Sequence, residues 1–450
     1  MLYYFEGGVA VKKRTMYFLY LVIAGVLLAG CSMQTVDQMY MLPKRSENYS
    51  NLQSVIDTAM HDLAYSAPLA GENQQSVQMA DVDGDGEQEY LVFAKGMAHL
   101  PLRILVFDKV DDKFLHIDTI ESNGASFDQV EYVHMDENPG LELIVGRQVS
   151  DQLVRSVSIY TFAGGEAEQL MTANYQKFIT VDMNGNGRSE LLVLRPGQAA
   201  SDTGVAELYT MKTGIIERSN EVSMSAPVDK LKRILVGSLQ DGKTAVYVAS
   251  AVEDTSLITD VFTQNDELLT NASLSSEPGT NVQTLRNYYI YADDMDNDGV
   301  LELPRLVAMQ PLEDTPAGGH SDLILWYAME SNGNTVDKLY TYYDAADGWY
   351  LELEESLAKI ITVRRLVNVF EFYVWDETGT NAWKLMTVYT LTGQNREEQS
   401  VVNGRFVLLK TDTVTYAASL EAEAANYQIT QDSLIRSFYL IHRDWNTGET

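Results

Sequence analysis

Short hydrophobic runs alternate with polar turns along most of the chain, and this pattern predicts β-strands. Four acidic or glycine-rich turns each have such a run on both sides. The runs VQMA, VEYVHM, KFITV and YYIYAD precede these turns, and YLVF, LIVG, LLVL and LPRLV follow them. The hydrophobic pattern therefore predicts an all-β chain.

Three of these turns share one spacing of acidic and amide residues. The first, DVDGDGEQE at 81–89, recurs as DMNGNGRSE at 182–190 and as DMDNDGVLE at 294–302. A fourth turn, HMDENPGLE at 134–142, keeps the spacing but begins with His134 instead of a carboxylate. The chain therefore contains an internal repeat.

The spacing of the turns predicts one more copy. Their first residues are 53, 48 and 112 residues apart, and half of the last interval places a further turn near residue 238. The segment RILVGSLQDGKTAVYVAS at 233–250 has two hydrophobic runs around an Asp-Gly turn but lacks the acidic ligands. A period of about 50 residues with short strands is typical of radially repeated β-blades, so we predict a β-propeller of about six or seven blades.

The residue types in the turns are those of a calcium site. Side-chain oxygens at positions 1, 3, 5 and 9 and a backbone carbonyl at position 7 are hard oxygen ligands, which suit calcium. The predicted ligands are Asp81, Asp83, Asp85, Glu87 and Glu89; Asp182, Asn184, Asn186, Arg188 and Glu190; and Asp294, Asp296, Asp298, Val300 and Glu302. An EF-hand would place a bidentate acid at position 12 between two helices. Position 12 is Val92, Val193 or Arg305 here, which excludes that motif.

The four turns should differ in affinity. We expect 81–89 to bind calcium best and 294–302 next, because 182–190 has only two carboxylates and Arg188 offers only its carbonyl. We expect 134–142 to bind nothing, since histidine is a poor calcium ligand. The predicted role of the ion is structural, to fix a strand-to-strand turn, and the alternative is that calcium bridges directly to a ligand.

The first 48 residues predict export and anchoring. A basic patch at 12–14 precedes the apolar run MYFLYLVIAGVLLAG at 16–30, which is shorter than the roughly 20 residues that a spanning helix needs. The run ends in LAGC, which resembles the bacterial lipobox, so 1–30 is predicted to be a lipoprotein signal peptide and 31–48 a tether. Cys31, the only cysteine, would carry the lipid and hold the protein outside the cytoplasm on the bacterial cell membrane; the alternative is a buried thiol.

A short helix is predicted after the tether. Leu52, Val55, Ile56, Met60 and Leu63 have helical spacing, and Ser50 with Gln53 forms a predicted capping box.

The acidic turns resemble FG-GAP/VCBS-type repeats, the calcium-bearing blades of integrin-α-like β-propellers. With the lipobox, the short helix and DGWYLELEES at 347–356, the layout is similar to a family of lipoproteins from anaerobic Gram-positive bacteria. The resemblance covers about residues 50–355 and implies a calcium-supported propeller, but the turn motif says little about activity.

The end of the chain allows two interpretations. Residues 49–345 are assigned to the blades, and 346–450 either add further blades or form a separate small β-rich domain. The segment TQDSLIRSFYLIHRDW predicts a terminal amphipathic helix with Leu434, Ile435, Phe438 and Ile441 facing inward. All five tryptophans lie beyond residue 316, and we expect Trp326, Trp375 and Trp383 to be core or turn residues rather than sugar-stacking sites.

Composition and motifs favour binding over catalysis. The net charge of −32 argues against nucleic acid or an anionic membrane surface as the main partner and favours cations. No HExxH, GxSxG or Walker A motif occurs. We predict a surface scaffold that binds a protein or a glycan; the alternatives are a structural subunit of a membrane complex and a propeller hydrolase of surface polysaccharide. In the hydrolase, Glu352 and Glu354 would form a carboxylate pair, although a half-buried strand explains these residues more simply.

Overall fold

A computed structural model describes residues 47–149, 154–198, 202–253, 255–274, 283–313 and 322–441. The described residues form two compact units, 47–61 with 109–116, and 62–108 with the described residues from 117 to 441. Cys31, the predicted signal peptide and all but the end of the predicted tether lie outside the described residues. Among the described helices, none is long and apolar enough to cross a membrane.

The smaller unit is built on one helix, α3 (Glu47–Ala59), which buries Leu52 and Ile56. The helix begins three residues before Ser50, so the predicted capping box is wrong. The Gln53 side chain instead donates forward to Asp57 Oδ1 at 2.8 Å, one helical turn away.

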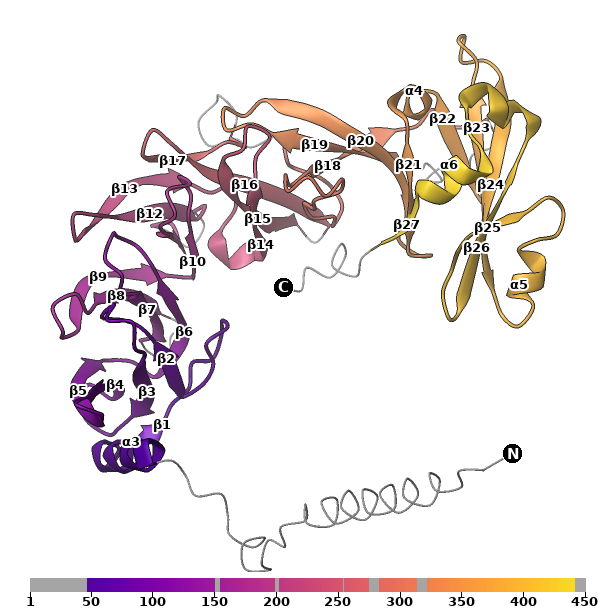
Figure 1. The fold of residues 1–450 in the computed structure, drawn as a ribbon. Coiled ribbons are helices and arrows are strands. Elements are labelled where there is room, and N and C mark those ends of the chain that lie inside the picture. Colours follow the sequence, from indigo (N-terminus) through magenta and orange to yellow (C-terminus); the bar gives the residue numbers. More distant parts are fainter. Residues whose placement is uncertain are drawn as a thin grey trace, which may run out of the picture. The chain divides into compact units, whose positions relative to one another are not determined.

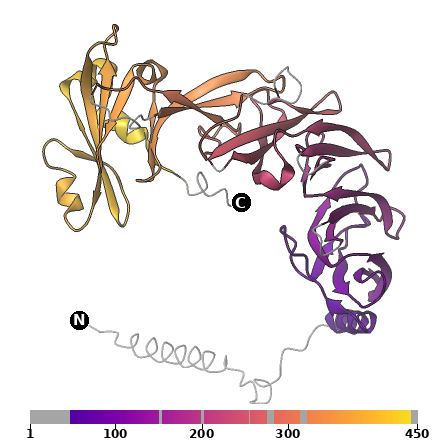
Figure 2. The same ribbon diagram turned by 180° about the vertical axis from the view of Figure 1, so that it is seen from behind.

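Antiparallel sheets follow one another along the chain, as the colours in Figures 1 and 2 show from two sides. They make up the larger unit, except that residues 109–116, where β4 ends and β5 begins, belong to the smaller unit. The first four sheets contain β1 (Ala64–Tyr65), β2 (Val77–Ala80), β3 (Glu89–Lys95), β4 (Leu102–Val110) and β5 (Lys113–Ser122); β6 (Ser126–Val133), β7 (Glu142–Gln148), β8 (Arg155–Thr161) and β9 (Glu168–Tyr175); β10 (Lys177–Val181), β11 (Glu190–Arg195), β12 (Val205–Lys212) and β13 (Ile215–Ser223); and β14 (Leu231–Ser238), β15 (Thr244–Glu253), β16 (Ser256–Asn265) and β17 (Leu268–Asn271).

The fifth and sixth sheets complete this series. They contain β18 (Leu303–Ala308), β19 (Asp322–Met329), β20 (Thr335–Asp344), β21 (Trp349–Leu353) and β27 (Phe438–Leu440); and β22 (Ile361–Arg365), β23 (Val369–Trp375), β24 (Ala382–Thr392), β25 (Phe406–Lys410) and β26 (Val414–Leu420). The short helices are η1 (Val228–Lys230), α4 (Glu355–Ala358), α5 (Arg396–Gln399), η2 (Ala422–Tyr427) and α6 (Gln431–Arg436). The predicted all-β class is confirmed.

The repeat turns occupy the same place in successive sheets. Turns 81–89, 134–142 and 182–190 connect the paired strands β2 and β3, β6 and β7, and β10 and β11. The predicted copy near 238 is the connection between β14 and β15, which are paired from Leu231 to Ser250. Turn 294–302 leads into β18 and is closed by a bridge between Asp293 and Glu302.

The hydrophobic core lies between consecutive sheets. Five clusters of buried side chains join the first sheet to the second, the second to the third, and so on to the sixth. Phe93 and Phe127 meet edge to face at 5.1 Å between the first two sheets, and Trp349 meets Phe370 at 4.9 Å between the last two. A sheet buried on both faces needs apolar residues at every position, which explains the continuous hydrophobic runs of the sequence.

The C-terminal segment belongs to the same unit as the repeats. The boundary expected between residues 345 and 346 falls between β20 and β21, which are paired strands of the fifth sheet. Trp326 is fully buried and Trp375 is 9% exposed, as expected of core residues, whereas Trp383 is 46% exposed at the start of β24, next to a turn. Trp349 is also fully buried, and Trp445 lies outside the described residues.

The predicted long terminal helix is wrong. Helix α6 ends at Arg436, and the chain then becomes β27, which pairs Phe438 with Leu351 at the edge of the fifth sheet. Ladder hydrogen bonds and the burial of Phe438 outweigh the local helical pattern.

Candidate cation-binding loops

The first aspartate of each acidic turn shapes the loop. Asp81 accepts hydrogen bonds from Gly84 N at 2.8 Å and from Gly86 N at 3.1 Å, one on each carboxylate oxygen. Asp182 accepts from Gly185 N and Gly187 N in the same way, at 2.8 Å each. Gly84 and Gly86 have positive φ angles of 81° and 93°, which explains glycine at these two positions.

The acids at positions 3 and 5 each use one oxygen to hold the loop. Asp83 Oδ1 accepts from Asp85 N at 3.1 Å, and Asp85 Oδ1 accepts from Glu87 N at 2.7 Å. In turn 294–302, Asp296 and Asp298 accept from the corresponding backbone groups at 3.2 and 2.8 Å. Each of these carboxylates therefore keeps a second oxygen for another partner.

The glutamate at position 9 is buried beneath each loop. Oε2 of Glu89, Glu142, Glu190 and Glu302 accepts the backbone N–H of the residue at position 2, at 2.8 to 2.9 Å. The other oxygen, Oε1, is buried without a hydrogen-bond partner among the described residues in Glu89 and Glu302. In Glu190 this oxygen accepts from Asn184 Nδ2 at 2.6 Å instead.

Burial without a cation raises the pKa of these glutamates. The pKa of Glu89 and the pKa of Glu302 are each raised to about 7, chiefly by desolvation and then by the negative charges of nearby aspartates. Desolvation also raises the pKa of Glu142 and that of Glu190. The loops thus hold a carboxyl group that is costly to ionise unless a positive charge is supplied.

Two of the four turns bring their ligands together. Asp81, Asp83 and Asp85 offer oxygens that all lie within 4.8 Å of one another, and so do Asp294, Asp296 and Glu302. These are the two turns that we expect to bind best. Such a cluster of carboxylate oxygens is the donor set that calcium prefers.

The remaining predicted ligands have other partners. Asp298 Oδ2 accepts from Lys338 Nζ at 3.0 Å, and Arg188 donates to Glu137 Oε1 at 2.7 Å. In turn 134–142, Asp136 accepts from both the backbone and the side chain of Asn138. In the second and third turns, Asp136, Glu137 and Arg188 therefore already have protein partners.

Backbone hydrogen bonds connect turns of adjacent sheets. The N–H at position 8 donates to the carbonyl of the first residue in the preceding turn: Leu141 to Asp81 at 3.0 Å and Ser189 to His134 at 2.8 Å. Leu301 donates to Ser238 in the same manner, at 3.2 Å. The sequence pattern did not reveal this contact, because a backbone group carries no signature of its own.

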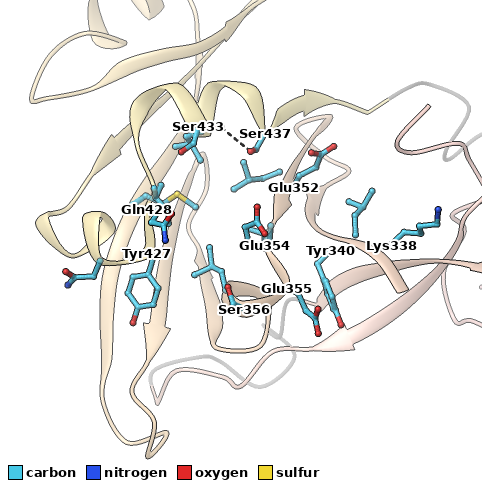
Figure 3. Close-up of a pocket in the computed structure, with 18 of the residues that line it drawn as sticks. Lys338, Tyr340, Glu352, Glu354, Glu355, Ser356, Tyr427, Gln428, Ser433 and Ser437 are labelled. Atoms are coloured by element: carbon cyan, nitrogen blue, oxygen red, sulfur yellow. Dashed lines mark hydrogen bonds between the residues drawn. The ribbon is translucent and has the colours of Figure 1, made fainter. Parts of the chain in front are cut away.

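A second candidate site is a cavity of about 910 Å³ in the fifth and sixth sheets (Figure 3). Glu352 and Glu354 both line it, with Tyr427 and Ser437 from the segment that follows the sixth sheet. Glu354 lies just beyond β21 at the start of α4, so only Glu352 belongs to the strand. Burial and the charge of Asp296 raise the pKa of Glu352.

Comparison with known proteins gives no family. No family model matches the chain, and no curated protein matches it. Solved structures with partial similarity include a rhamnogalacturonan lyase of Bacillus licheniformis, 10% identical over 80% of this chain and 82% of that chain, with a TM-score of 0.30. The exotype rhamnogalacturonan lyase YesX is 12% identical over 72% of this chain and 68% of its own, with a TM-score of 0.27. At TM-scores this low, neither similarity bears on the function of this chain.

Proposed function

We propose that this chain is a lipid-anchored, extracytoplasmic scaffold that binds a protein or a glycan and whose β-sheets are stabilised by calcium. Lipidation at Cys31 rests on the apolar run and the LAGC sequence. The calcium part of the proposal rests on turns 81–89 and 294–302. The scaffold role rests on the regular series of sheets and on the lack of a catalytic sequence motif.

The six sheets are proposed to be blades of a propeller. Each of the first four contains a four-stranded antiparallel meander, and each shares a hydrophobic cluster with the next sheet. Repeated four-stranded sheets that pack face to face are the building units of propellers.

One observation carries the calcium proposal: Oε1 of Glu89 and Oε1 of Glu302 are buried without a hydrogen-bond partner among the described residues, each beneath a loop that bears further carboxylates. An unpaired buried carboxylate is strongly destabilising, and a bound divalent cation would offset this cost. Asp81, Asp83, Asp85 and Glu89 would hold the ion in the first turn; Asp294, Asp296 and Glu302, whose oxygens lie together, would hold it in the other.

Thermal unfolding of residues 49–450 in EDTA and in millimolar calcium tests this proposal. Calcium should raise the unfolding midpoint, because a ligand present at about 10 to 100 times its Kd adds about 1.4 to 2.7 kcal/mol per site. The double variant Asp81→Asn/Asp294→Asn should lose most of this response, while Asp182→Asn should lose little. An equal calcium response in the wild type and in the double variant would contradict the proposal.

A further inference from the structure

The cavity lined by Glu352 and Glu354 is strongly acidic. Residues from β20, β21, α4, η2 and α6 surround it, and four of them are carboxylates: Asp337, Glu352, Glu354 and Glu355. Figure 3 shows Glu352, Glu354 and Glu355 along the segment from β21 into α4, with Tyr427 and Gln428 on the other side. Lys338 is the single basic residue among the lining residues that the structure describes.

The negative charge of the cavity is not balanced from within. Lys338 donates to Asp298 at 3.0 Å, in turn 294–302, and so is occupied by a carboxylate that does not line the cavity. Glu355 is paired with Lys359 at 2.6 Å. Glu352 and Glu354 form no ion pair and no side-chain hydrogen bond with any residue that the structure describes. Two carboxylates thus line the cavity without a partner among the described residues, Glu352 half-buried and Glu354 exposed.

Apart from these charged residues, the side chains at the base of the cavity are apolar. Leu351, Leu353, Leu357, Met386 and Leu434 are buried, each with at most 8% of its surface exposed. Hydroxyl and amide groups, including those of Ser433 and Gln428, add hydrogen-bonding capacity. A ligand that fits has a positive group for the carboxylates and an aliphatic body for the leucines.

We propose that this cavity binds a small organic cation, an alkylammonium or guanidinium compound, held by Glu352 and Glu354. The volume of about 910 Å³ is in the range of small-molecule sites. A charge-assisted hydrogen bond to a carboxylate is about twice as strong as a neutral one. A neutral sugar would desolvate the half-buried Glu352 without supplying a counter-charge. This inference rests on the proposed binding role and narrows the ligand to one that carries an ammonium or guanidinium group, which a protein supplies and a neutral glycan does not.

Titration calorimetry with two matched probes tests the inference. 1,6-Diaminohexane and 1,6-hexanediol share one aliphatic stem and differ only in charge. They should be titrated into residues 49–450 at neutral pH, with saturating calcium and physiological salt to screen weak attraction. We expect the diamine to bind with one site and the diol not to bind. Equal binding of both probes, or no binding of the diamine, would overturn the inference.

The variants Glu352→Gln/Glu354→Gln and Glu166→Gln/Glu168→Gln separate the cavity from general electrostatics. Both remove two negative charges at the same spacing, and Glu166 and Glu168 are exposed at and before the start of β9, far from the cavity lining in sequence. The first variant should weaken diamine binding about tenfold or more, and the second should leave it unchanged. Equal weakening in both would show only non-specific attraction to an acidic protein and would overturn the inference.

Two further readouts keep the result interpretable. A trilysine peptide that binds more tightly than the diamine would identify the source of the cation as a partner protein, and weaker binding would identify it as a free amine; either supports the cationic ligand class. The calcium-dependent midpoint of the same variants, measured separately, reports on the calcium proposal and on folding. Failure of the cavity inference is therefore distinguishable from failure of the proposed function.

Discussion

At the scale of single residues, the two carboxylate oxygens of the glutamate at position 9 of a turn have different roles. Oε2 of Glu302 fixes the turn by accepting from Met295 N at 2.9 Å, whereas Oε1 has no partner among the described residues. Without a cation, this group reaches neutrality by taking up a proton. The proton and the calcium ion thus compete for one carboxylate.

This competition predicts an unusual dependence of stability on pH. In EDTA, the free energy of unfolding should fall as the pH rises from about 4.5 to about 7, because Glu89 and Glu302 keep protons in the folded state that the unfolded chain releases. The fall attributable to both groups should be on the order of 5 kcal/mol. Saturating calcium should abolish it. Urea unfolding at a series of pH values measures both curves.

The control is Glu89→Gln/Glu302→Gln, in which the side chain can still accept the backbone hydrogen bond but cannot titrate. In EDTA, its stability should depend on pH less steeply than that of the wild type. Identical pH profiles for the two proteins would show that these glutamates do not titrate in the folded state.

At the scale of elements, the turns act between sheets as well as within them. Gly140, at position 7 of the second turn, packs against the backbone of the first turn, and a Cβ atom there would lie 2.5 Å from Val82 O. This contact accompanies the hydrogen bond from Leu141 N to Asp81 O. The second turn therefore supports the first even if it binds no ion.

The Gly140→Ala substitution should lower the free energy of unfolding by about 1 to 3 kcal/mol, because the added methyl group overpacks a backbone contact. It should also weaken the calcium response of the first turn. Gly164→Ala is the matched control, since a Cβ atom at Gly164 would meet nothing within 4 Å. Urea unfolding should show little change for Gly164→Ala, and an equally small change for Gly140→Ala would contradict this account.

The sequence predicted the elements well where their signals are local. The strands around Asp81 and Asp182 follow from their flanking hydrophobic runs, and the degenerate turn after Ser238 follows from the repeat spacing. The prediction of a long terminal helix was wrong because pairing with Leu351 in the sheet stabilises Phe438 more than continuing the helix would. Local periodicity contains no information about such a distant partner.

The two candidate sites differ in how far apart their residues lie in the sequence, and this decides which of them the sequence could predict. The ligands of each acidic turn lie within nine consecutive residues, so their spacing alone predicts the cluster. The cavity combines Glu352 with Tyr427 and Ser437, which lie more than seventy residues further along the chain. No sequence motif predicts that these distant residues line one cavity. The sequence pointed only to the pair Glu352 and Glu354.

At the scale of the whole molecule, the propeller proposal predicts a compact particle. A closed, compact arrangement of about 400 residues should have a radius of gyration near 21 Å. Small-angle X-ray scattering of residues 49–450 in calcium measures this value directly. A much larger radius, independent of protein concentration, would show that the sheets do not close into a ring.

The sixth sheet carries ion pairs that closure of a ring over them would bury. Arg364 and Lys384 lie near Glu371, at 3.8 and 3.5 Å, and Lys384 also pairs with Glu421 at 3.1 Å. Burying such ion pairs against another sheet is costly unless every charge keeps a partner. An open arrangement would leave them in solvent.

The hydrogen bond from position 8 to the preceding turn also bears on how such a chain diverges after duplication. Its acceptor is the backbone carbonyl of Asp81, His134 or Ser238, so the contact is the same whichever side chain stands there. A duplicated unit can then exchange its acidic residue for histidine or serine and still dock onto its neighbour. Mutational drift can erase the ion sites one at a time, while the succession of sheets is inherited intact.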